Sequence, residues 1–140
     1  ENMVGWMYAK LGQYEEGLRH CRRGLDLATE TGSRSLAADV LDSLGMINLA
    51  MGEHEQALSW YQQALAAFRE NDDARGTFSA LSGIGDVHLT VGRSEAAKET
   101  WHRALAGAEG LPPSLIAELR EKLIALESGP VAGGMATVIR

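Results

Sequence analysis

The sequence predicts an all-α fold: about three helical hairpins stacked side by side, followed by a capping helix. Two observations support this prediction. A pattern of small and apolar residues recurs every 40 residues, and within each repeat the apolar residues are spaced as on one face of a helix. The chain of 140 residues is the size of one ordinary domain.

The repeat consists of columns of similar residues with a constant step of 40. The columns are Gly5, Gly45 and Gly85; Gly12, Gly52 and Gly92; Val4, Leu44 and Ile84; Gly17, Ala57 and Ala97; Cys21, Tyr61 and Trp101; Gly24, Ala64 and Ala104; and Leu25, Leu65 and Leu105. So many columns at a single step indicate one structural unit that is used three times.

The middle repeat shows what this unit is. Val40 and Leu44 lie on the apolar face of a first helix over residues 36–51, and Gly52 can take the left-handed conformation that ends a helix. A second helix follows, with Tyr61 on its apolar face. Because the loop between them is short, the two helices are predicted to form an antiparallel hairpin, which must stack on its neighbours to bury its apolar face.

The other hairpins follow from the same columns. They are predicted at residues 2–11 with 14–30, and at 78–91 with 94–108, so that the repeats span about 1–33, 34–73 and 74–110. Pro112-Pro113 then breaks the chain and starts a capping helix at 113–128, since proline is tolerated in a first helical turn. Residues 129–140 are predicted to form a flexible tail or linker.

Composition narrows the possible functions. The chain has 13 Lys+Arg against 19 Asp+Glu, a net charge of −6, which argues against direct nucleic-acid binding. One cysteine excludes an internal disulfide and suits a reducing cytoplasm. No apolar run approaches the ~20 residues of a membrane-spanning helix, and no signal peptide is recognisable. Because the chain starts at Glu1 without a methionine, we interpret it as a piece of a longer cytoplasmic protein.

The repeated residues resemble the tetratricopeptide repeat. The matching residues are Leu41, Leu44-Gly45, Gly52, Ala57, Tyr61 and Ala64 in the middle repeat, and Leu81, Ile84-Gly85, Gly92, Ala97, Trp101 and Ala104 in the third. The resemblance implies a right-handed α-α superhelix, a solenoid, that binds proteins or peptides, is not an enzyme and needs no cofactor.

The resemblance has departures. The first repeat keeps Val4-Gly5, Tyr8 and Gly12, but Cys21 stands where an aromatic residue is usual. The tyrosine column that starts at Tyr8 continues as Asn48 and His88.

The 40-residue period and the segments GEHEQALSWYQQAL and GRSEAAKETWHRAL look similar to a narrower group. This group is the extended repeats at the C-terminus of actinobacterial AfsR/SARP-type transcriptional regulators. That resemblance implies a sensor or partner-binding part of a larger bacterial regulator.

In such repeats the first helix of each hairpin lines a concave groove, and the resemblance implies which residues point into it. These are Asn2, Trp6, Ala9, Lys10, Asp39, Asp42, Met46, Leu49, Ala50, Ser79, Ser82, Asp86, Leu89 and Thr90. Chaperone-binding members of the family hold the terminal carboxylate of a peptide with basic residues and asparagine at these positions. The acidic and apolar lining of this chain therefore argues against a ligand of that kind. It predicts a partner with basic and apolar side chains, with Asp39, Asp42 and Asp86 selecting the positive charge.

Other features give no catalytic or metal site. The histidines, His20, His54, His88 and His102, include no i, i+4 pair, and no second cysteine is present. Cys21 aligns with aromatic residues and is interpreted as a packing residue. Gly83-Ile84-Gly85 lacks the third glycine of a phosphate loop and lies in a predicted helix.

The basic cluster Arg19-His20-Cys21-Arg22-Arg23 is interpreted as solvated surface, with an acidic partner or a phosphate backbone as the alternative. For the whole chain, the alternatives to a binding module are a regulatory sensor that restrains an upstream ATPase and a self-association module that forms a homodimer. An enzyme is the weakest hypothesis.

Overall fold

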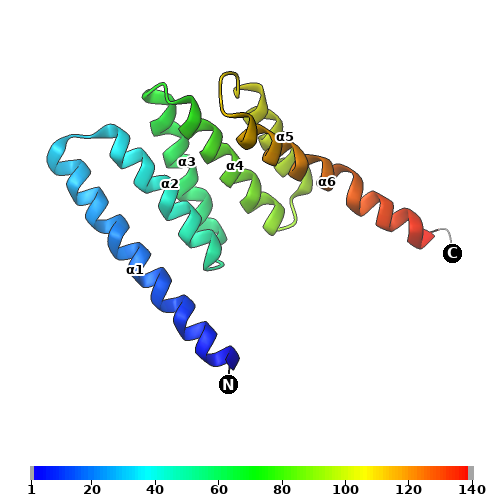
Figure 1. The fold of residues 1–140 in the computed structure, drawn as a ribbon, viewed down its shortest axis with the longest axis horizontal. Coiled ribbons are helices and arrows are strands. Elements are labelled where there is room, and N and C mark those ends of the chain that lie inside the picture. Colours follow the sequence, from blue (N-terminus) through cyan, green and yellow to red (C-terminus); the bar gives the residue numbers. More distant parts are fainter. Residues whose placement is uncertain (1, 139–140) are drawn as a thin grey trace.

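The computed structural model describes the backbone of residues 2–138 and the side chains of residues 10–128. This part of the chain contains helices only: α1 (Asn2–Thr31), α2 (Arg34–Ala50), α3 (His54–Glu70), α4 (Ala74–Thr90), α5 (Ser94–Ala106) and α6 (Pro113–Val138). The helices stack in chain order, and α2/α3 and α4/α5 form antiparallel hairpins (Figure 1). The predicted all-α helical-repeat solenoid is confirmed.

The turns inside the two hairpins have the predicted chemistry. Gly52 and Gly92 take left-handed backbone angles, with φ of 82° and 87°, which residues with a Cβ rarely adopt. Between the repeats, the side chains of Ser33 and Asp73 cap α2 and α4 by accepting hydrogen bonds from the Leu36 and Gly76 amides. These two caps therefore fix the residues at which α2 and α4 begin.

Glycines allow the helices to approach around one aromatic ring in each hairpin. The Tyr61 ring on α3 lies against Gly45 on α2 and Gly83 on α4, and a Cβ at Gly45 would lie only 2.7 Å from Tyr61 Cδ1. Trp101 on α5 packs in the same way against Gly85, and its indole Nε1 donates to the Ser82 carbonyl at 3.1 Å. The seven sequence columns thus include the contact pairs that join the helices.

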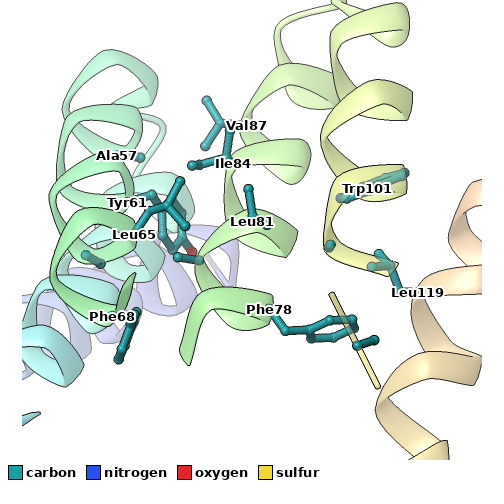
Figure 2. Close-up of a cluster of buried hydrophobic side chains, with 14 of the residues drawn as sticks. Ala57, Tyr61, Leu65, Phe68, Phe78, Leu81, Ile84, Val87, Trp101 and Leu119 are labelled. Carbon is teal, nitrogen blue, oxygen red and sulfur yellow. The ribbon is translucent and has the colours of Figure 1, made fainter. Parts of the chain in front are cut away.

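One continuous apolar core results. It runs from α2 through α3 and α4 to Trp101 on α5 and Leu119 on α6 (Figure 2). Among the described side chains, Trp101 is the largest that is fully buried. A smaller cluster around Cys21, Val40 and Leu44 joins α1 to α2.

The prediction of a first hairpin is wrong. Residues 2–11 and 14–30 belong to the single helix α1, and Gly12 does not take a left-handed conformation. The physical reason is in the aromatic column: Tyr61 and Trp101 fill the space between the two helices of their hairpins, whereas the small Cys21 cannot hold a second helix in the same way. Without that contact, the helical hydrogen bonds continue through Gly12.

The capping helix is also longer than predicted. It was expected over 113–128, but α6 continues to Val138 and leaves the stack (Figure 1). Gly129 and Pro130 are weak helix formers, yet a helix that has already formed can extend through such residues at a cost. The side chains of residues 129–140 lie outside the described part, and the flexibility of this tail stays a prediction.

The glycine contacts can be tested with Gly85→Ala. Alanine is intrinsically the better helix former, but its Cβ would collide with the Trp101 indole, so we expect the free energy of unfolding to fall by about 1–3 kcal/mol. Urea denaturation followed by circular dichroism measures this change. The control is Gly107→Ala, because no atom lies within 4 Å of a Cβ there. Equal stability of the two variants would contradict the close packing at Gly85.

Candidate functional site

The predicted groove residues of α2 and α4 lie on matching faces of their helices. At 100° per residue, Asp39, Asp42, Met46 and Leu49 fall within a narrow arc of α2, and Ser79, Ser82, Asp86 and Leu89 fall within the same arc of α4. We call the surface formed by these two arcs and the adjoining side of α6 the groove face.

Two side-chain contacts join the three helices across this face. The Ser79 hydroxyl on α4 donates to Asp42 Oδ2 on α2 at 2.8 Å. The Lys122 ammonium on α6 donates to Asp86 Oδ1 on α4, also at 2.8 Å. The groove face is therefore one connected surface from α2 to α6.

A cavity of about 290 Å³ opens on the groove face between α4 and α6. Its apolar lining comes from Phe78, Leu115 and Leu119, and its polar lining from Arg75, Ser79, Ser82, Glu118 and Lys122. Ser79 and Lys122 are also the residues that contact Asp42 and Asp86. The cavity is thus linked to Asp42 and Asp86 through two of its lining side chains.

The exposure of the predicted residues varies. Met46 is 58% exposed and Leu89 is 39% exposed, and Asp39 is also exposed. Asp42, Leu49, Ser82 and Asp86 are half-buried. Lys10 is half-buried on α1, and the side chains of Asn2 and Trp6 lie outside the described residues, so their place on the groove face stays a prediction.

Asp42 is a desolvated carboxylate. Its Oδ1 atom is buried and has no hydrogen-bond partner among the described residues. Burial raises the pKa of Asp42, the Ser79 hydrogen bond acts in the opposite direction, and the nearby Asp39 raises the pKa further. Burial and the charge of Asp73 likewise raise the pKa of Asp39. Asp39 therefore lies close enough to Asp42 and to Asp73 for charge repulsion at one end of the face.

Asp86 differs because the chain itself neutralises it. Lys122 pairs with Asp86 and also lies over the Trp101 ring, 5.2 Å from its centroid. Lys122 is not among the site residues that the sequence predicted. An alignment of α6 with α4 by their first residues would have pointed to it. In that alignment Lys122 corresponds to Gly83, which lies against Tyr61, the aromatic ring of the helix before α4.

A second hollow, of about 540 Å³, lies between α1, α2 and α3. Leu44 and Asn48 of α2 line it, at roughly 200–240° around the helix from Asp42. This hollow is therefore on the other side of α2 from the groove face.

The described side chains include no group of three or more His, Cys, Asp or Glu residues that could hold a metal ion. Burial raises the pKa of the Cys21 thiol, which opposes formation of the nucleophilic thiolate. Burial, with a smaller effect from Arg93, lowers the pKa of His88. Among the described helices, none is both long enough and apolar enough to cross a membrane.

The charge of Asp42 gives a testable pH dependence. The folded chain holds the Asp42 proton more tightly than the unfolded chain does. Protonated Asp42 therefore contributes its full stabilisation of the fold below the pKa of the unfolded chain. This contribution is lost as the pH rises through the higher pKa of the folded chain. Asp42→Asn keeps an acceptor for Ser79 and removes the charge. We expect the variant to be more stable than the native chain at neutral pH, with a difference that shrinks toward about pH 4.

Urea denaturation at several pH values measures this effect. Glu99→Gln removes an exposed carboxylate of α5 and serves as the control. A stability difference for Asp42→Asn that is independent of pH would show that desolvation of the charge is not its cause.

The comparison with known families agrees with this architecture. A family model described as tetratricopeptide repeat matches residues 2–70 and 36–110. Among curated proteins, none matches the chain. Repeats of this kind generally mediate protein–protein interactions and serve as non-enzymatic scaffolds. With its glycine-ended hairpins, its aromatic contacts and this match, the chain belongs to the tetratricopeptide repeat family.

Proposed function

We propose that the groove face binds a segment of another protein, or of another domain of the same parent protein, that carries apolar and basic side chains. The observation that carries this proposal is the cavity between α4 and α6, which has an apolar floor and whose lining residue Ser79 contacts the uncompensated carboxylate of Asp42. An apolar side chain of the partner would enter the cavity against Phe78, Leu115 and Leu119. Exposed Met46 and Leu89 extend the apolar contact.

The carboxylates give the proposed charge preference. Within the described residues, Asp39 and Asp42 have no cationic partner, while Asp73 adds negative charge. A lysine or arginine of the partner would relieve this repulsion and would lower the raised pKa of both groups. Lys122 already makes such a pair with Asp86, which leaves Asp39 and Asp42 as the carboxylates for a ligand.

Selection of peptides from a random library on the immobilised chain tests the proposal. We expect enrichment of sequences in which lysine or arginine accompanies an apolar residue. The double variant Asp39→Lys/Asp42→Lys should bind these peptides at least about tenfold more weakly, because it replaces attraction by repulsion on the groove face.

The matched control is Asp26→Lys/Glu99→Lys, which makes the same charge change at exposed positions of α1 and α5. Circular dichroism checks that all variants remain helical. The proposed site would be contradicted if basic peptides bound the Asp39→Lys/Asp42→Lys variant as tightly as the native chain. It would also be contradicted if the selection enriched no basic peptides.

We also propose the wider setting that the narrower resemblance suggests. In it, the chain is the C-terminal sensor or partner-binding part of a larger bacterial transcriptional regulator in the cytoplasm, and it makes no direct contact with nucleic acid. The coding sequence upstream of Glu1 tests this: a nucleotide-binding P-loop or a helix-turn-helix would support the regulator, and their absence would contradict it.

A second candidate function is homo-oligomerisation. The single helix α1 supports it, because the backbone of residues 2–11 continues the helix of residues 14–30 and does not fold back on it, which gives a second copy a helix to pack against. Light scattering tests the idea. A dimer that becomes a monomer when residues 1–11 or 129–140 are removed supports self-association, and a monomer throughout contradicts it.

A further inference from the structure

The hollow between α1 and α3, which we call the α1/α3 hollow, is separate from the proposed groove site. It has a volume of about 540 Å³ and an apolar part made by Leu18, Leu25, Leu44 and Trp60. The rest of its lining consists of Arg22, Asn48, Gln56, Ser59 and Gln63. An apolar floor with a polar rim is the usual composition of a site that receives a side chain from a partner.

The hollow exists because a large side chain is missing from α2. Asn48 occupies the sequence column that starts with Tyr8 and continues with His88. Its side chain is buried and turns back on its own helix, where Nδ2 donates to the Leu44 carbonyl at 2.8 Å. Asn48 is thus satisfied without filling the space between α1 and α3, and an aromatic ring from elsewhere can take that space.

The charge at the rim indicates the kind of partner. Arg22 is the only charged residue that lines the hollow, and it is exposed. No ion pair links Arg22 to the other described residues, whereas the neighbouring Arg19 faces Glu16 at 4.0 Å. In the next hairpin the same column holds Gln62, and in the third it holds His102, which lies 3.3 Å from Glu127, so Arg22 is the residue of this column that has a fixed positive charge and no acidic partner among the described residues. On a chain of net charge −6, an unpaired arginine beside an apolar hollow favours an acidic ligand.

We propose that the α1/α3 hollow binds an acidic protein segment that inserts an aromatic side chain. The aromatic ring packs between Leu18, Leu44 and Trp60, where the edge and face of the indole are suited to another ring. A carboxylate next to that ring in the partner accepts hydrogen bonds from the Arg22 guanidinium. Because the hollow and the groove face lie on different sides of α2, the chain can hold two different segments at once.

Blocked pentapeptides test the proposal on the whole chain. The probe is Glu-Glu-Phe-Glu-Glu, and its companions replace the phenylalanine by alanine or all four glutamates by lysine. The indole N–H resonances of the ¹⁵N-labelled chain report binding, with Trp60→Phe assigning the Trp60 signal. We expect the acidic aromatic probe to shift the Trp60 resonance and to leave the buried Trp101 resonance in place. Both companions should bind at least about tenfold more weakly.

Variants locate the site. Asn48→Tyr refills the hollow and should reduce affinity at least about tenfold, and Arg22→Gln should reduce it several-fold. Arg23→Gln, the same charge change at the next residue, should leave binding unchanged, because Arg23 does not line the hollow. Should Asn48→Tyr misfold, Gln63→Trp covers the hollow from its exposed rim and makes the same test.

Three outcomes would overturn the proposal. The first is an unchanged Trp60 resonance at saturating probe. The second is binding that survives both hollow-filling variants. The third is binding of a thymidine oligonucleotide, used as a further probe, with the same dependence on Arg22. That result would show that Arg22 binds a phosphate backbone, and the proposal of an acidic protein segment would be wrong.

Discussion

The packing of an aromatic ring against helix glycines is the contact on which the rest of the structure depends. Tyr61 on α3 brings α2 and α4 close enough for Ser79 to reach Asp42. Trp101 on α5 packs against Gly85 of α4, and Lys122 of α6 lies over its ring. The groove face, its cavity and its pattern of charge therefore follow from where two rings pack. The alignment of the carboxylates is a consequence of core packing and needs no separate explanation.

The sequence was sufficient for the parts of the fold that depend on local pattern. Helix periodicity and the glycines at 52 and 92 predicted two hairpins that the structure contains, because these glycines take the left-handed conformation that ends a helix. The same signal at Gly12 failed. There the outcome depended on a long-range contact that Cys21 is too small to make, and a column of identical glycines cannot show that difference.

The candidate site could be predicted only as far as the faces of the helices. Which residues share a face follows from 100° per residue once the helix bounds are known. Which charges remain available does not follow, because Lys122 reaches Asp86 from a helix far along the chain. The α1/α3 hollow had a sequence signal, the loss of tyrosine at Asn48, but its size depends on the way that this side chain bonds to its own helix.

The surface of α6, the last helix that the structure describes, has a consequence for higher assembly. Ile124 occupies the position in α6 that Gly45 occupies in α2 and Gly85 in α4, counted from the start of each helix. Ile124 is 61% exposed. A β-branched side chain there leaves no room for the aromatic ring of a further hairpin. Copies of the chain therefore cannot add to this end by the contact that builds the stack, and the open-ended growth that leads to fibres is blocked on that side.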